Sequence, residues 1–181
     1  MTGQEEYYRA VNTATEITTM TQEQEKNTGV VISIAKYRDC VEAEKWPDVA
    51  NNKDGFGNMK WTKLYELQER KSSRFLCKIH NAQDNRLLAL FAGRISANDS
   101  DGARVSIDFI ERHRDATEIK GHVIVIALKY AYTLCDLFMF DFVKLLNPAP
   151  GLLSTYKAEM PDWIYTEHRK YSYLMAPVQH T

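Results

Sequence analysis

Several features that would assign a function directly are missing from this sequence. The three cysteines, Cys40, Cys77 and Cys135, are odd in number and far apart, so they predict neither a disulfide framework nor a metal site of paired thiolates. The formal net charge is only -1, from 23 basic and 24 acidic residues, which gives no long-range attraction to nucleic acid or an anionic membrane. No apolar run is long enough to cross a bilayer. We therefore expect a cytoplasmic protein with reduced thiols, no metal, and no nucleic-acid or membrane partner.

Motifs for two common classes of chemistry are also missing. The only glycine pair at close spacing, Gly55 and Gly57, follows no expected strand and lacks the Lys-Ser/Thr of a nucleotide phosphate loop. No serine or cysteine has the local sequence of a hydrolase nucleophile. The sequence thus offers no support for nucleotide hydrolysis or for nucleophilic hydrolysis.

The chain is long enough for one domain with a full core. Residues 1–28 are polar and predict a loosely packed helix or a frayed arm, whereas residues 29–181 predict a single domain. Hydrophobic periodicity and turn signals divide this domain into strands and helices. The expected strands are 30–35, 74–80, 86–96, 104–111, 137–145, 163–166 and 171–175, and the expected helices are 38–46, 59–70, 117–134 and 152–159.

Short polar turns separate the second, third and fourth expected strands, which indicates an antiparallel meander. The long apolar helix 117–134 then joins two strands, as expected of a parallel crossover. We predict an α+β fold with a central, mixed but mostly antiparallel sheet, one parallel β-α-β crossover and flanking helices. In such a unit the start of the crossover helix can bind a phosphate, because its free amides and dipole favour an anion.

The order of these elements resembles that of the GCN5-related N-acetyltransferase superfamily over residues 30–175. Residues 107–111, Ile-Asp-Phe-Ile-Glu, look like the fourth strand of that family. Residues 120–122, Lys-Gly-His, look like the turn that binds the coenzyme A pyrophosphate, although only one of the usual two or three glycines is present. Asn147 through Tyr156 looks like the exit of the fifth strand and the helix that follows it.

The resemblance implies a fold, an activity and a set of site residues. It implies an N-acyltransferase that takes acetyl-coenzyme A or another acyl-coenzyme A as co-substrate and acylates a small-molecule or peptide amine. The implied catalytic pair is Tyr156, which would donate a proton to the thiolate, and Glu111, which would take the amine proton. The implied coenzyme A contacts are Phe109, Ile110, Lys120, Gly121, His122 and Asn147.

Four points stay open from the sequence. The glycine-poor turn allows the alternative of a catalytically inactive protein of the same fold that binds or regulates a partner. Strand alternation places the side chains of Asp108 and Glu111 on opposite faces of the strand. Asp108 is therefore the poorer candidate base, unless a bulge shifts the register. The resemblance also puts Trp46, Phe56 and Trp61 near the acceptor, with core packing as the alternative for Trp61. Finally, the expected C-terminal hairpin offers an edge for pairing in a homodimer.

Overall fold

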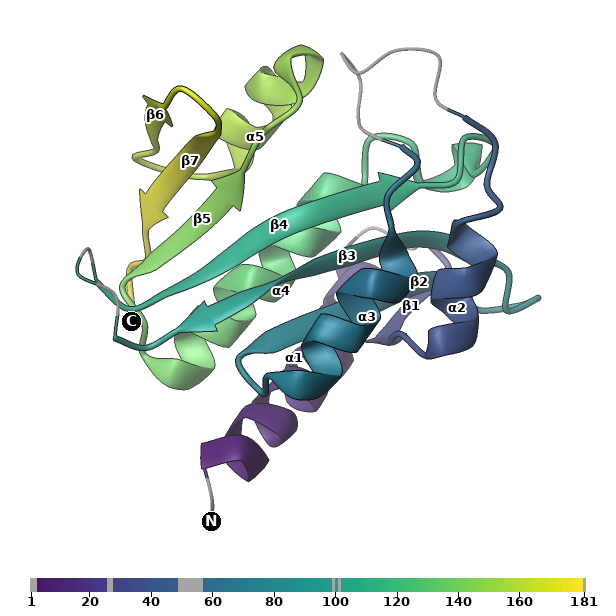
Figure 1. Ribbon diagram of the computed structural model, residues 1–181, viewed down its shortest axis with the longest axis horizontal. Coiled ribbons are helices and arrows are strands. Elements are labelled where there is room, and N and C mark those ends of the chain that lie inside the picture. Colours follow the sequence, from purple (N-terminus) through teal and green to yellow (C-terminus); the bar gives the residue numbers. More distant parts are fainter. Residues whose placement is uncertain (1–2, 26–27, 49–56, 99, 101, 181) are drawn as a thin grey trace.

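The computed structural model describes residues 3–25, 28–48, 57–98, 100 and 102–180. They form one seven-stranded sheet with the strand order β1-β2-β3-β4-β5-β7-β6, flanked by helices on both faces (Figure 1). The predicted α+β class, with one parallel strand pair in an otherwise antiparallel sheet, is confirmed.

The first four strands pair antiparallel in chain order, and the second to fourth of them form the predicted meander. They are β1 (Val30–Ile34), β2 (Arg74–Asn81), β3 (Leu87–Ser96) and β4 (Arg104–Arg112). Because β3 lies inside the sheet and is covered on both faces, most of its side chains are buried.

The crossover is also present, but the predicted boundary between its helix and the strand that follows is wrong. Helix α4 spans Val123–Phe138 and strand β5 spans Phe142–Leu146, so the first residues of the expected strand 137–145 belong to the helix. Met139 ends the helix in the left-handed conformation, with φ 56°. The apolar run through this region resembled a buried strand because a helix end and a strand of similar composition follow each other directly.

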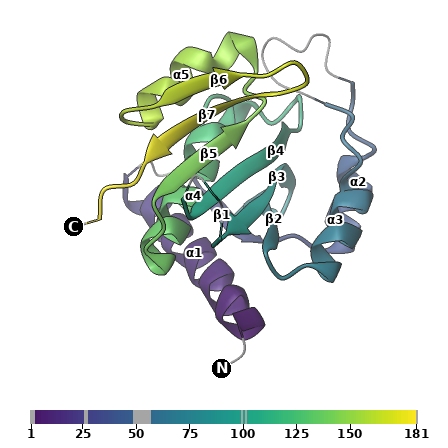
Figure 2. The same ribbon diagram turned by 60° about the vertical axis from the view of Figure 1, so that its left-hand side comes forward.

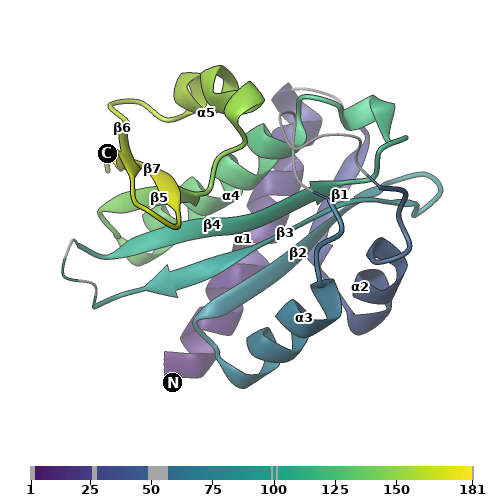
Figure 3. The same ribbon diagram turned by 45° about the horizontal axis from the view of Figure 1, so that its top comes forward.

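The helices lie on the two faces of the sheet (Figures 2 and 3). Helices α1 (Gly3–Glu25) and α4 cover one face, and α2 (Tyr37–Ala43) and α3 (Trp61–Arg70) cover part of the other. Of the two states that the sequence allowed for the N-terminal segment, residues 3–25 adopt the helix. Although α1 has few apolar residues, Val11 and Ala14 belong to the main core beneath α4.

The chain ends with a helix and a hairpin. A 3-10 turn (Pro150–Leu152) leads into α5 (Leu153–Glu159), and β6 (Ile164–Glu167) and β7 (Ser172–Pro177) follow. β7 pairs with β5, which leaves β6 at the edge of the sheet. Within the described part of the chain, no helix combines the length and apolarity needed to cross a membrane.

Candidate active site

Strands β4 and β5 run parallel at one end and then separate. Their pairing covers Arg104 to Ile107 of β4 and Phe142 to Leu145 of β5. β4 continues beyond this point to Arg112, whereas β5 ends at Leu146 (Figure 1). The sequence-predicted residues Phe109, Ile110 and Glu111 all lie on the part of β4 that β5 no longer accompanies.

A bulge marks the point of separation. Ala92 of β3 pairs with Phe109, but the next residue, Gly93, pairs with Ile107, so Asp108 is the extra residue. Gly93 is required here because a Cβ at this position would lie 1.8 Å from the carbonyl oxygen of Ser106. The close approach of the two backbones therefore depends on the glycine.

The bulge puts Asp108 and Glu111 on the same face of the sheet, contrary to simple alternation. Ile107 belongs to the core beneath α1 and α4, whereas Phe109 packs against the core beneath α2 and α3. Asp108 accepts hydrogen bonds from Ser106 Oγ at 2.7 Å and from Arg94 Nε at 2.7 Å, and its side chain is 4% exposed. Strand alternation is therefore no reason to prefer Glu111 over Asp108 as the base. The ion pair with Arg94 nevertheless occupies the Asp108 carboxylate.

Glu111 is held by the segment that leads into α3. Its Oε1 accepts a hydrogen bond of 2.6 Å from Trp61 Nε1, and backbone bonds from Asn58 and Met59 reach the same carboxylate. The residue is 3% exposed. Burial raises the pKa of Glu111 above its ordinary value, and these three donors offset part of the increase. A raised pKa makes the Glu111 carboxylate a stronger proton acceptor than an ordinary glutamate.

The space beside Gly121, just before α4, is free of the described residues. Gly121 has φ 83°, which favours glycine, and a Cβ there would contact no described residue within 4 Å. His122 is the N-cap residue, and its side chain makes no capping hydrogen bond. The first α-helical bond in this region joins the Ile126 amide to the His122 carbonyl, so the preceding first-turn amides are available in the manner typical of helix starts.

The helix begins later than predicted. Thr117–Ile119 forms a separate 3-10 turn, and Gly121 interrupts the chain before α4 begins at Val123. Ile119 is fully buried and fixes this turn to the core. Lys120 is exposed, whereas Val123 is buried in the main core.

Asn147 and Tyr156 lie on the β5 side of the separation. Asn147 has φ 46°, and it exchanges two hydrogen bonds with Ser172: its amide donates to the carbonyl, and its Oδ1 accepts from the Ser172 amide. Its side-chain amino group makes no hydrogen bond to the described residues. Tyr156, on α5, is 5% exposed, and burial raises its pKa to about 12 although a backbone hydrogen bond of Ala149 opposes the increase.

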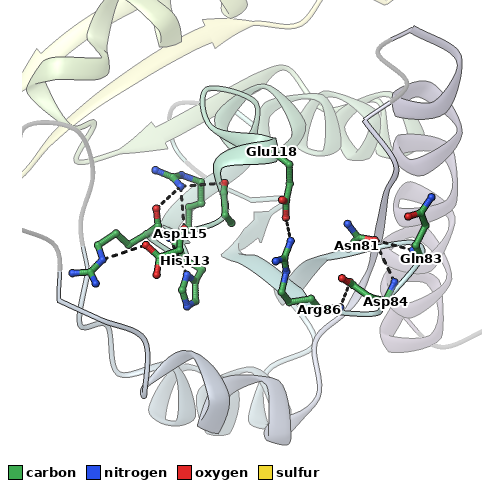
Figure 4. Close-up of polar contacts among 10 residues, drawn as sticks. Asn81, Gln83, Asp84, Arg86, His113, Asp115 and Glu118 are labelled. Atoms are coloured by element: carbon green, nitrogen blue, oxygen red, sulfur yellow. Dashed lines mark hydrogen bonds and ion pairs between the residues drawn. The ribbon is translucent and has the colours of Figure 1, made fainter.

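A pocket of about 310 Å³ lies behind the loop that joins β4 to α4. Trp46, a predicted pocket residue, lines it together with Arg86 and His113, and the Trp46 and His113 rings meet edge-on at 5.5 Å. Figure 4 shows Arg86 reaching toward Glu118, with which it forms an ion pair. Phe56 lies outside the described residues.

Two sets of contacts in this region were not predicted, one made by Arg112 and the other by Trp61. Arg112 Nη1 donates to the carbonyls of His113, Arg114 and Ala116, so one guanidinium shapes the loop that leads to the helix start. Trp61, for which core packing was the alternative, is fully buried and bonded to Glu111. Both contacts join residues whose sequence context carries no recognisable motif.

No protein-family model matches the sequence, and no curated protein matches it significantly. The fold, however, is similar to solved structures. A chimera of spermidine N-acetyltransferase SpeG from Vibrio cholerae and hSSAT has a TM-score of 0.59 at 11% identity, over 82% of this chain and 95% of the other. AtaTR bound with AcCoA has a TM-score of 0.59 at 11% identity, over 82% and 93%.

Spermidine N-acetyltransferase from Vibrio cholerae in complex with CoA and spermine has a TM-score of 0.57 at 14% identity, over 83% of this chain and 96% of the other. At these identities the comparisons establish the architecture. The chain has the fold of the GCN5-related N-acetyltransferases, as the order of its elements predicted.

Proposed function

We propose that this chain is an acyl-coenzyme A-dependent N-acyltransferase, which transfers an acetyl or other acyl group to an amine. The observation that carries the proposal is the separation of β4 from β5 at the Asp108 bulge, in a fold shared with structures described as bound to AcCoA or CoA. A second support is the free space beside Gly121, just before α4.

The residues at the helix start fit a pyrophosphate. The free amides after His122 supply convergent donors, and the helix dipole favours the anion. The exposed Lys120 adds a positive charge, and Gly121 permits the left-handed backbone without a side chain over the site. These three residues would bind the charged part of the carrier.

The pantetheine arm would lie where the two strands part. Its amides can pair with the backbone of Phe109 and Ile110 as an additional short strand would. From the other flank, the Asn147 side-chain amino group can donate to an arm carbonyl, because its Oδ1 is already bonded to Ser172.

In the transfer step, the amine nitrogen forms a bond to the thioester carbonyl carbon and the C–S bond breaks. The amine proton goes to Glu111, directly or through a water molecule, and the departing sulfur receives a hydrogen bond from Tyr156. With a pKa of about 12 the Tyr156 phenol keeps its proton at neutral pH, so it can donate to the sulfur but does not take the amine proton. Asp108 is not assigned this role, because its carboxylate is already bonded to Arg94 and Ser106.

Release of free thiol from acetyl-coenzyme A, measured with a panel of small amines and peptides, tests this function. Tyr156→Phe should lower kcat at least tenfold, a loss of about 1.4 kcal/mol of transition-state stabilisation, with little effect on KM for acetyl-coenzyme A. Tyr132→Phe is a matched control, because Tyr132 also has a pKa raised by burial to about 12 and its hydroxyl has no partner among the described residues. Absence of thiol release with every acceptor, or equal losses in the two variants, would contradict the proposal.

A further inference from the structure

The pocket of about 310 Å³ is separate from the proposed active site. Its lining comes from the end of α2, the start of β3 and the loop that follows β4, and it includes none of the residues assigned to acyl transfer. The volume is at the lower end of the range for small-molecule sites, which is roughly 300–1,000 Å³. The pocket therefore has room for one small organic molecule.

The inner wall of the pocket is apolar. Four buried residues provide it: Trp46, Leu87, Leu88 and Ala116. Trp46 and Leu87 belong to the core beneath α2 and α3, whereas Leu88 and Ala116 belong to the main core. The wall thus continues both cores to the surface, and it favours a ligand with an aliphatic side chain.

The charged groups around this wall are paired with one another except for two. Arg86 forms an ion pair with Glu118 (Figure 4), and Asp115 forms one with the arginine beside it. Glu42 and Lys45 also line the pocket, but their side chains make no hydrogen bond or ion pair with any described residue. One acid and one base are therefore available to a ligand.

The spacing of these two groups matches a zwitterion. The Lys45 amide donates to the Glu42 carbonyl at 3.0 Å, so the two residues lie on one helical turn. Side chains three residues apart on a helix are neighbours, with Cβ atoms ~5–6 Å apart. Because an α-amino acid carries its ammonium and its carboxylate on the same carbon, the two groups can reach Glu42 and Lys45 together.

His113 adds a donor for the carboxylate. The Asp115 amide donates to its Nδ1 at 3.0 Å, so the neutral ring carries its proton on Nε2. The ring lines the pocket, meets Trp46 edge-on at 5.5 Å, and makes no hydrogen bond through Nε2 to the described residues. The Nε2 proton can therefore be shared with the same carboxylate as Lys45.

We propose that this pocket binds a free aliphatic amino acid of the size of leucine as an effector. Lys45 and His113 bind the carboxylate, Glu42 binds the ammonium, and the side chain lies against the apolar wall. Because the Glu42 carboxylate favours the protonated form of the amine, the amino acid bound here is not an acceptor for acyl transfer.

The pocket shares a wall with the proposed pyrophosphate site. His113 and Ala116 lie in the loop whose carbonyls accept from Arg112, and the same loop leads through one 3-10 turn to Lys120 and Gly121. A ligand that joins α2 to this loop stabilises the conformation that presents Gly121. This step, which rests on the proposed function, predicts that the amino acid raises the affinity for acetyl-coenzyme A and that each ligand strengthens the other by the same factor.

Calorimetric titration of L-leucine into the full chain, without acetyl-coenzyme A, tests the site. Three analogues each lack one group: isocaproate lacks the ammonium, isoamylamine lacks the carboxylate, and glycine lacks the side chain. Each should bind about tenfold more weakly than leucine or worse. No heat from leucine at millimolar concentration, or analogues that bind as tightly as leucine, would overturn the proposal.

Two substitutions test the assignment of the charged groups. Lys45→Met should weaken both leucine and isocaproate about tenfold, whereas Glu42→Gln should weaken leucine and leave isocaproate unchanged. Arg38→Met is the matched control, because Arg38 is exposed on the same helix and does not line the pocket. Equal leucine affinity in Lys45→Met and Arg38→Met would overturn the proposal.

Titration of acetyl-coenzyme A with and without saturating leucine tests the effector role. Leucine should tighten acetyl-coenzyme A about fivefold or more. Unchanged affinity, or formation of N-acetylleucine, would overturn the effector role. Heat from leucine but none from acetyl-coenzyme A would contradict the proposed function and the coupling, while it would support the amino-acid site.

Discussion

Trp61 and Glu111 join two elements of the structure through a single buried hydrogen bond. The indole Nε1 donates to the carboxylate at 2.6 Å, and both residues are almost completely shielded from water. The bond ties the start of α3 to the far end of β4, in the part of β4 that extends past β5. The proposed base is therefore held by the segment that covers it.

Replacing Trp61 with phenylalanine tests this contact. The change removes one hydrogen-bond donor from a buried carboxylate and also reduces the volume of the side chain. It should therefore lower the free energy of unfolding by about 2–4 kcal/mol. Trp46→Phe is the matched control, since Trp46 is also buried but packs edge-on against His113 and donates to no carboxylate among the described contacts. Denaturant unfolding should show the larger loss for Trp61→Phe; equal losses would mean that the indole contributes only packing.

The raised pKa of Glu111 predicts a direction for the pH dependence of stability. The folded protein holds this proton at higher pH than the unfolded chain does, so stability should fall as pH rises from about 4.5 through the folded-state pKa. Glu111→Gln removes the titration. The difference in unfolding free energy, wild type minus variant, should therefore decrease over this range. A difference that increases with pH would show that the three hydrogen bonds outweigh burial.

Gly93→Ala tests the bulge. A methyl group 1.8 Å from the Ser106 carbonyl forces the two strands apart, which should cost more than about 3 kcal/mol or abolish folding. Gly3→Ala is the control, because a Cβ at Gly3 meets nothing within 4 Å and alanine suits the start of α1. Equal thermal stability of the two variants would contradict the register described for β3 and β4.

Gln22 predicts a stabilising substitution. It is 1% exposed, and neither its amide nitrogen nor its amide oxygen has a partner among the described residues. Gln22→Met keeps most of the volume and removes the buried polar atoms, so the free energy of unfolding should rise by about 1 kcal/mol. Gln24→Met, at an exposed position of the same helix, should change stability little. A loss of stability in Gln22→Met would mean that the amide is bonded in solution.

The meander and the crossover could be predicted because each rests on local patterns. Polar turns separate the strands of the meander, and the spacing of apolar residues along α4 gives a helical face. The end of α4 could not be located from the sequence, because Phe138 and Met139 suit a strand as well as a helix end. In the structure the left-handed backbone of Met139 marks where the helix ends.

The candidate site was less accessible to sequence reasoning. The bulge at Asp108 depends on how Gly93 meets Ser106 across a strand pair, which no local pattern specifies. The bond between Trp61 and Glu111 joins positions 50 residues apart, so only the folded chain shows it. Gly121 could be singled out because an isolated glycine before a long apolar helix has a local physical meaning.

Calorimetric titration of acetyl-coenzyme A into two glycine variants tests the central claim most directly. Gly121 and Gly29 both have a positive φ, 83° and 65°, and a Cβ at either would meet nothing within 4 Å, so valine should strain the backbone comparably at both. Only Gly121 lies at the start of α4; Gly29 immediately precedes β1, which is an edge strand of the sheet. The account predicts that wild type and Gly29→Val bind acetyl-coenzyme A, whereas Gly121→Val binds at least tenfold more weakly, about 1.4 kcal/mol. No heat from the folded wild type at high micromolar ligand, or equal affinity in the two variants, would contradict it.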